Sequence, residues 1–330
     1  MTVFSWSRAG LLALVAVAMV ACAAPQKSAV VSAPAPVERF AEGLVWQLDH
    51  PDLPTAYLVG TQHVDGPGVI PVVQTARLLL SEVDVVALEV DMNPPDDIAP
   101  LVWQHFTDTS PPFLDQELDP RLWNFLARQG GAIGVPTSRL RLLSPTGAAF
   151  IFSNEFAPSG PRPADYGVDA QIADLAQQRQ LQVIGLESHE ESLQSLFRVG
   201  DWADRWIDPD AIVGNALLQT VLVGKVGAWR PRRLNPTASA AYASEDIAYF
   251  AAVSFDDTRA MTPAARDLQR VTRDYLLVER NYRFIDRMLQ RLPDGPMLVA
   301  VGAAHLPGPE GMLELLAARG FEATRVPLAR

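Results

Sequence analysis

The sequence predicts an α/β fold, or an α+β fold, built on a central mixed sheet. Two observations carry this prediction. An apolar strand-like segment runs into a Gly-x-x-His tetrapeptide twice, at 57–63 and again at 297–305, and each time a helix-like and then a strand-like segment follow. The apolar run from Val85 to Leu88 is also continuous, which is typical of a strand buried on both faces. The chain between the two units has a largely helical pattern.

Composition limits the classes of protein to which the chain can belong. It has 330 residues, of which 48% are hydrophobic and 20% are charged, a balance typical of a globular chain with a sizeable core. The formal net charge is -11. An acidic chain is a poor partner for nucleic acid, so we expect no nucleic-acid binding. Composition leaves the oligomeric state open.

The first 39 residues are predicted to lie outside the folded domain. The apolar run at 11–20 is too short for an ordinary membrane-spanning helix, so residues 1–21 are interpreted as a secretory signal peptide. The run leads into Met19-Val20-Ala21-Cys22, which resembles the lipobox of bacterial lipoproteins and implies cleavage before Cys22 and lipidation of its sulfur. Residues 22–39 are rich in Ala, Pro, Ser and Val and are predicted to be a flexible tether.

Cys22 is the only cysteine, so an intramolecular disulfide is excluded. The alternative to lipidation is a thiol buried in the core, which the signal-like context argues against. Lipidation would anchor the chain in the bacterial cell envelope, and we expect the outer membrane, facing the periplasm. Residues 40–330 are predicted to form a single domain.

The first unit begins with a predicted hairpin. Gly43 to His50 and Thr55 to Gly60 are strand-like, and the residues between them carry turn signals, including two prolines. After His63 and a Gly/Pro loop, Val72 to Val83 is predicted to be a helix with a broad apolar face. The strand that starts at Val85 then follows.

The same order returns near the C-terminus. A strand from Met297 to Val301 leads to the second histidine, and Gly311 to Arg319 is predicted to be a helix that Gly320 stops. Phe321 to Val326 is the last predicted strand. We interpret the two units as a pseudo-repeat of architecture, because their sequence identity is slight.

The middle of the chain is predicted to consist mainly of helices with start signals. One helix begins at Asp119-Pro120, and another runs from Asp169 to Gln180 and leads into a strand from Leu181 to Leu186. Ser188 begins the next helix, with Glu191 at capping-box spacing. A long helix runs from Thr262-Pro263 to about Arg291.

Four polar side chains fall at the carboxyl ends of predicted strands: His63, Glu89, Glu187 and His305. In open α/β sheets ligands bind at these ends. Two imidazoles and a carboxylate, with room for water, form the ligand set of a catalytic metal centre, and a second carboxylate could act as general base. The residues leave open which glutamate is the ligand.

Each candidate has a structural alternative. A histidine after a strand often bonds nearby backbone. Glu89 could cap the next loop, where Asp91 is a competitor for its role, and Glu187 could simply be a negative charge favoured at the start of the following helix. His50, His105 and His189 lack the strand-glycine context and are predicted to be structural or exposed.

One polar residue interrupts an apolar row in the last long helix. Leu277, Asn281, Phe284 and Met288 share one helical row, so Asn281 needs a partner if it is buried. Arg280 and Asn281 could hold substrate or orient a catalytic carboxylate. The alternative is a structural hydrogen bond or an ion pair on the helix surface.

Five blocks in order resemble the signature of the TraB/GumN family. The blocks are Tyr57-Leu58-Val59-Gly60-Thr61-Gln62-His63, Leu88-Glu89-Val90-Asp91, Gly185-Leu186-Glu187, Glu279-Arg280-Asn281, and Val301 to Gly308. That family is similar to the Tiki metalloproteases of animals and, more distantly, to erythromycin esterases. The resemblance spans about Gly43 to Val326, nearly all of the mature domain.

The resemblance implies a metal-dependent hydrolase fold. His63 and His305 would be the motif histidines, Glu89 a metal or catalytic carboxylate, and Glu187 and Arg280 further site residues. The implied cofactor is a divalent ion such as Mn, Co or Zn. The chain departs from the Tiki branch in its N-terminal lipobox and in a diverged middle segment, so the peptide substrate does not carry over directly.

Two functions are therefore expected. The first is a lipid-anchored metal-dependent hydrolase, with a peptidase as the leading form, that acts on a peptide or another small substrate. The second is a non-catalytic envelope lipoprotein that binds haem, a metal or another ligand. A structural envelope protein with a vestigial pocket is a third possibility that no residue pattern supports.

Overall fold

The computed structural model describes residues 39–63, 66–90, 98–118, 120–132, 134–145, 147–148, 167–205, 236–255 and 263–329. The predicted signal peptide and residues 22–38 of the predicted tether, with Cys22, lie outside the described residues, as do Asp91, Asp119 and Thr262. Among the residues that are described, no helix is long and apolar enough to cross a lipid bilayer.

A mixed sheet organises the described chain. Its strands are β1 (Val45–His50), β2 (Leu53–Thr61), β3 (Val85–Val90), β4 (Gln182–Glu187), β5 (Met297–Gly302) and β6 (Glu322–Arg325), in the spatial order β4-β3-β5-β2-β1-β6. β1 is antiparallel to β2 and β6, whereas β2, β3, β4 and β5 pair in parallel. The predicted α/β class with a mixed sheet is confirmed.

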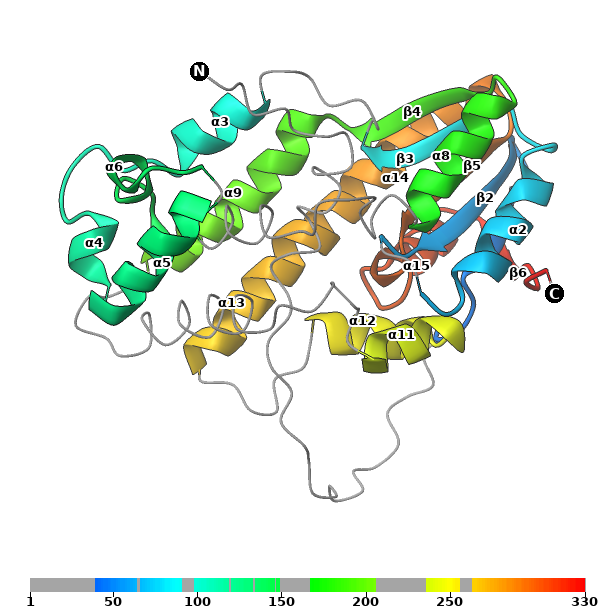
Figure 1. Ribbon diagram of the computed structural model, residues 1–330. Coiled ribbons are helices and arrows are strands. Elements are labelled where there is room, and N and C mark those ends of the chain that lie inside the picture. Colours follow the sequence, from blue (N-terminus) through cyan, green and yellow to red (C-terminus); the bar gives the residue numbers. More distant parts are fainter. Residues whose placement is uncertain are drawn as a thin grey trace.

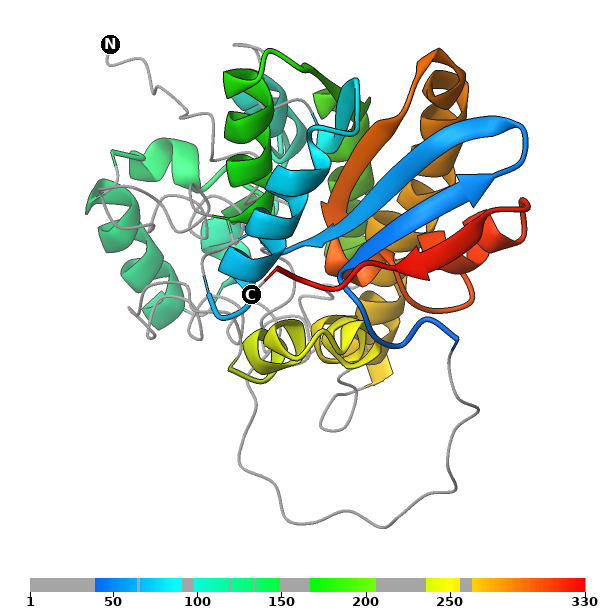
Figure 2. The same ribbon diagram turned by 90° about the vertical axis from the view of Figure 1, so that its right-hand side faces the viewer.

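Helices cover both faces of the sheet. Helix α2 (Val69–Leu79) and helix α8 (Val168–Gln178) pack on one face, while α14 (Glu279–Arg291) and α15 (Met312–Ala317) lie on the other (Figures 1 and 2). α2 joins β2 to β3, and α15 joins β5 to β6. Both predicted units therefore form strand–helix–strand structures in one sheet.

The middle of the chain forms a second, helical part. Its helices are α3 (Ile98–His105), α4 (Leu114–Glu117), α5 (Pro120–Ala132), α6 (Thr137–Leu140) and α9 (His189–Arg205). They share a separate apolar cluster that includes Val102, Phe106, Leu126 and Phe197. In Figure 1 the strand arrows point toward this helical part, so the carboxyl ends of the strands face it.

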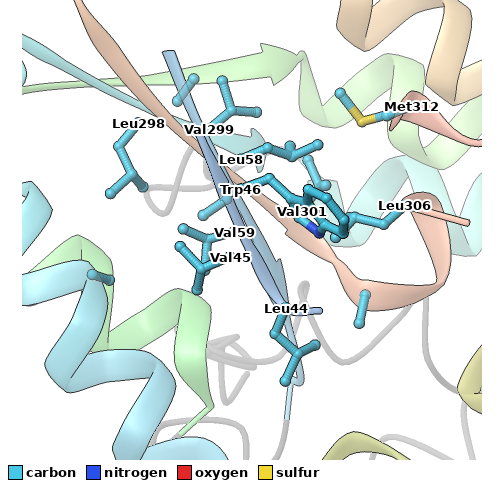
Figure 3. Packing of buried hydrophobic residues seen from close by; sticks show 14 of the residues in the cluster. Leu44, Val45, Trp46, Leu58, Val59, Leu298, Val299, Val301, Leu306 and Met312 are labelled. Carbon is cyan, nitrogen blue, oxygen red and sulfur yellow. The ribbon is translucent and has the colours of Figure 1, made fainter. Parts of the chain in front are cut away.

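The central pair of strands, β2 and β5, carries the main core. Leu58, Val59, Leu298 and Val299 are fully buried and pack with residues of β1, as Figure 3 shows. In the parallel register of this pair, Thr61 lies opposite Gly302. The two Gly-x-x-His segments therefore leave the sheet side by side, although they are far apart in sequence.

Two predicted helices differ in detail from those observed. α2 begins at Val69, three residues earlier than predicted, because Gly68 with φ 89° turns the chain just before it. The long C-terminal helix is divided into α13 (Pro263–Arg273), a π-helical turn at Asp274–Val278, and α14. Buried residues recur every four positions here, at 276, 277, 280, 281, 284, 285 and 288, so one side of the π-helical turn and of α14 packs into the protein.

Two further helices complete the fold. α11 (Pro236–Ala243) and α12 (Ile247–Phe255) lie below the carboxyl end of β2 in Figure 1. The capping box predicted for α9 is confirmed, because the backbone N–H of Ser188 donates to Glu191 Oε2 at 2.8 Å and the Glu191 N–H donates to Ser188 Oγ at 3.1 Å.

Candidate functional site

Three of the candidate side chains meet beside Gly302. A Cβ placed on this glycine would lie 3.2 Å from Glu89 Oε1, 3.6 Å from His305 Cδ2 and 3.7 Å from His63 Nε2. Glu89 Oε1 is also 3.7 Å from His305 Nε2, which is too long for a hydrogen bond. The two histidines thus reach one space from opposite ends of the chain.

This space is nearly closed. The side chains of His305 and Glu89 are 3% and 4% exposed, whereas that of His63 is 16% exposed. His63 is therefore the side of the cluster that solvent reaches most easily. Electrostatic interactions inside such a site are stronger than at the surface, because little water screens them.

The glycine of each Gly-x-x-His motif makes room for the other motif. A Cβ on Gly60 would lie 3.1 Å from Leu306 Cδ2 and 3.2 Å from Ala303 Cα, in the turn that carries His305. Gly302 leaves the space in which the candidate side chains meet. Neither glycine has a positive φ. Close approach of the two motifs, and not an unusual backbone turn, is therefore the reason for glycine at both positions.

Asp169 orients His63. Its Oδ2 lies 2.8 Å from His63 Nδ1, and because a carboxylate only accepts, that nitrogen carries the proton and donates it. Burial alone lowers the pKa of His63, but the Asp169 charge and hydrogen bond outweigh burial and raise this pKa to about 9. The other ring nitrogen, Nε2, faces the space beside Gly302.

The backbone around His63 is fixed from two sides. The N–H of Val168, at the start of α8, donates to the carbonyl of Gln62 at 2.9 Å, and a Cβ on Gly167 would come within 2.7 Å of the His63 carbonyl carbon. From α11, the Tyr242 hydroxyl donates to the carbonyl of Gly60 at 2.9 Å. These contacts hold the loop that begins at the end of β2.

Asn281 orients His305 in a corresponding way. The Asn281 amide nitrogen donates to the backbone carbonyls of Glu310 at 2.7 Å and His305 at 3.3 Å, so its oxygen must face the ring. That oxygen accepts from His305 Nδ1 at 2.6 Å. Burial lowers the pKa of His305 to about 3, helped by Arg280 and His63 and opposed by Glu89. His305 is therefore neutral near pH 7, with its lone pair on Nε2.

Arg280 lies behind the site and connects the two glutamates. It is completely buried and donates from Nη2 to Glu89 Oε2 at 2.7 Å and from Nε to Glu187 Oε1 at 2.8 Å. Arg283 donates to the second oxygen of Glu187 at 3.0 Å. The guanidinium groups of two arginines therefore cover Glu187, whereas Glu89 has one oxygen toward the histidines.

Glu89 stays charged despite its burial. Burial raises the pKa of Glu89, but Arg280, the two histidines and the N–H of Gly302, which donates to Oε1 at 2.6 Å, hold it well below its ordinary value. A carboxylate with this environment remains negative at every physiological pH. It is the permanent negative charge beside the two imidazoles.

The predicted site residues therefore fall into two groups. His63, Glu89 and His305 lie together beside Gly302, while Arg280, Asn281 and Glu187 lie behind them and contact them or one another. His50 and His105 lie elsewhere, against Phe321 and Phe197 respectively. Cys22 is outside the described residues.

Asp169 is a site residue that the sequence did not predict. The residue was predicted only as the first residue of a helix, and an acidic side chain at that position is ordinarily explained by capping and the helix dipole. Its contact with His63 crosses 106 positions of sequence. No local signal distinguishes an aspartate that caps its own helix from one that reaches a distant histidine.

The family comparison covers the whole of this site. The sequence model of the TraB/PrgY/gumN family matches residues 44–325. The chain belongs to the TraB/PrgY/gumN family. The match includes both Gly-x-x-His motifs, both glutamates, Asp169, Arg280 and Asn281, so the resemblance inferred from the five blocks is confirmed. No curated protein and no solved structure matches the chain.

Among the described residues of this TraB/PrgY/gumN member, no group of three or more His, Cys, Asp or Glu side chains has the arrangement of a metal site. The donor types beside Gly302 are nevertheless those that Zn²⁺, Co²⁺ and Mn²⁺ accept, namely imidazole nitrogen and carboxylate oxygen. The missing side chain of Gly302 leaves a space that a Cβ would fill. The chemistry of the residues thus fits a divalent cation.

We expect Arg280→Met to destabilise the fold by about 3–5 kcal/mol, because it leaves Glu89 and Glu187 as buried carboxylates without their shared cation. Urea unfolding measures the loss. Arg270→Met is the control, because Arg270 is 64% exposed and pairs with exposed Asp267. The control should lose less than about 1 kcal/mol. Equal losses in the two variants would contradict this role of Arg280.

Asp169→Asn should lower the pKa of His63 from about 9 toward its ordinary value, because the carboxylate charge is removed. Because the pKa of His63 is raised in the folded state, its charge interaction with Asp169 stabilises the fold fully below about pH 6.5, the ordinary pKa of histidine. This stabilisation is lost as the pH rises through about 9, the pKa of His63 in the folded state. NMR titration and pH-dependent unfolding, both with a chelator present, measure these effects. A His63 pKa that is unchanged in the variant would refute the assignment.

Proposed function

We propose that this chain is a metal-dependent hydrolase of the bacterial cell envelope that cleaves peptide bonds. His63, His305 and Glu89 would hold the divalent cation. The observation that carries the proposal is that two imidazoles and one carboxylate meet within 4 Å of a single point beside Gly302. Membership of the TraB/PrgY/gumN family is consistent with it.

The arrangement of the donors supports a cation at this point. Ligands of a tetrahedral site with bonds of about 2.1 Å are separated by about 3.4 Å. Glu89 Oε1 and His305 Nε2 are 3.7 Å apart, so a small shift brings them to this separation. His305 offers a free lone pair, and Glu89 supplies the negative charge that a cation requires. His63, whose pKa is raised to about 9, would release the proton from its Nε2 when the cation binds.

The surrounding residues have separate roles in this proposal. When bound, the cation supplies Lewis acidity that polarises a peptide carbonyl group. Asp169 and Asn281 hold the two imidazoles with Nε2 toward the space beside Gly302, as partners of metal-binding histidines do. Arg280 fixes the orientation of Glu89 and keeps it charged. Glu187, whose oxygens both accept from arginines, would support Arg280.

Metal analysis combined with peptide cleavage tests the proposal. The purified chain should bind one divalent cation and cleave members of a mixed peptide library. His63→Ala, His305→Ala and Glu89→Gln should each lower the cation affinity by at least about 100-fold, because a direct ligand contributes more than its supporting partner. His50→Ala, outside the site, is the matched control. Site variants that bind the cation as the wild type does would refute the proposal.

The low exposure of the site favours one alternative function. Glu89 and His305 are almost inaccessible, which would suit a protein that retains a ligand without turning it over. A non-catalytic binding lipoprotein would take up the cation and cleave no peptide. Haem binding is checked separately, since a haem titration without a Soret shift would exclude that form of the alternative.

We also propose that the diacylglyceryl group on Cys22 anchors the chain to the outer membrane, facing the periplasm. The supporting observation is the lipobox-like Met19-Val20-Ala21-Cys22 after a short apolar run. Cys22→Ser should move the protein from the membrane fraction to the soluble fraction, because the buried methylene groups of the lipid are lost. Fractionation with metabolic lipid labelling measures this. A labelled, membrane-bound Cys22→Ser variant would contradict the anchor.

A further inference from the structure

A buried hydroxyl group stands beside the candidate site without a partner. Thr61 is the last residue of β2, and its side chain is 1% exposed. Its Oγ1 makes no hydrogen bond in the part of the chain that the structure describes. Leaving a buried hydroxyl unpaired is unfavourable, so such a group points to a partner that is bound from outside the chain.

The direction of this side chain follows from the sheet. Thr61 and Gly302 are paired in the parallel ladder between β2 and β5, and paired residues project from the same face. A Cβ on Gly302 would point at Glu89 Oε1 and His63 Nε2. The side chain of Thr61 is therefore placed on the same face of the sheet as the space beside Gly302, on the strand next to that glycine.

Glu89 and His305 are unsuited to recognise an acceptor, and His63 loses the donor on its Nε2 if that nitrogen binds the cation. The lone pair of His305 and the carboxylate of Glu89 accept hydrogen bonds or bind cations. The second motif has Ala303 where the first has Thr61, so only the first motif supplies a hydroxyl. Thr61 is thus the neutral donor on the strand next to Gly302.

We propose that Thr61 is a further catalytic residue, whose hydroxyl donates a hydrogen bond to the carbonyl oxygen of a bound peptide. The inference rests on the proposed hydrolase and adds to it a residue that recognises the amide carbonyl. As negative charge develops on that oxygen, the hydrogen bond strengthens, as it does for donors in oxyanion holes. The hydroxyl keeps its proton throughout and only donates.

Thr61→Val tests this assignment, because valine keeps the shape and removes the hydroxyl. No hydrogen bond within the described chain is lost, so the melting temperature of the metal-free protein should be unchanged or higher. The value of kcat for peptide cleavage should fall by about 100-fold, as it does when an oxyanion donor is removed. Thr61→Ser, which restores a hydroxyl, should recover most of the activity.

Thr75→Val is the matched control. Thr75 is also buried, but its hydroxyl donates to the carbonyl of Pro71 at 2.8 Å and accepts from the Ala329 N–H at 2.7 Å. This variant should melt at a lower temperature and retain its kcat. Thr61→Val should thus lose activity without losing stability, and Thr75→Val should lose stability without losing activity. This contrast distinguishes a functional hydroxyl from a structural one. A Thr61→Val variant that melts as early as Thr75→Val would overturn the proposal.

A second measurement does not depend on turnover. Acetate offers oxygen acceptors, and its binding to the Co²⁺-loaded chain can be followed by visible absorption. Thr61→Val should bind Co²⁺ as the wild type does but bind acetate about tenfold more weakly, the loss expected for one hydrogen bond. Unchanged kcat and acetate affinity in this variant would overturn the role of Thr61 alone. A wild type that binds no Co²⁺ would instead overturn the proposed hydrolase and this inference together.

Discussion

The parallel pairing of β2 with β5 is the constraint on which the rest of the site depends. These strands lie near opposite ends of the chain, and their register sets Thr61 beside Gly302. A shift of one residue would turn every side chain of one strand to the opposite face. The buried apolar side chains of both strands fix the register, because a slip would expose them. Core packing and site geometry therefore depend on the same pairing.

A second constraint is the buried cation of Arg280. It contacts Glu89 and Glu187, which lie at the carboxyl ends of the neighbouring parallel strands β3 and β4. Buried ion pairs contribute little net stability, because desolvation offsets most of their attraction. Their effect here is on orientation and charge. Arg280 holds Glu89 negative and directed toward the histidines.

Local patterns were sufficient to predict the strands, the helices with clear start or stop signals, and the polar residues at strand ends, but α11 and α12 were not predicted individually. The strand, the glycine and the histidine are adjacent in sequence, so each Gly-x-x-His unit could be recognised directly. The buried Asn281 was recognisable for the same reason, because it interrupts an apolar row. The distinction between Glu89 and Glu187 was not predictable, since both follow apolar strands. It depends on strand order, with β3 next to β5 and β4 at the edge of the sheet. Asp169 was missed because its contact with His63 is made only in the folded chain.

In the proposed site, His63 and His305 hold one cation through their Nε2 atoms. X-ray absorption spectroscopy of the Co²⁺-loaded chain would detect these two ligands. The wild-type spectrum should show two imidazole ligands at about 2.1 Å, and replacement of either histidine by alanine should leave one. A spectrum with no imidazole scattering, or one that neither replacement changes, would rule out this shared cation.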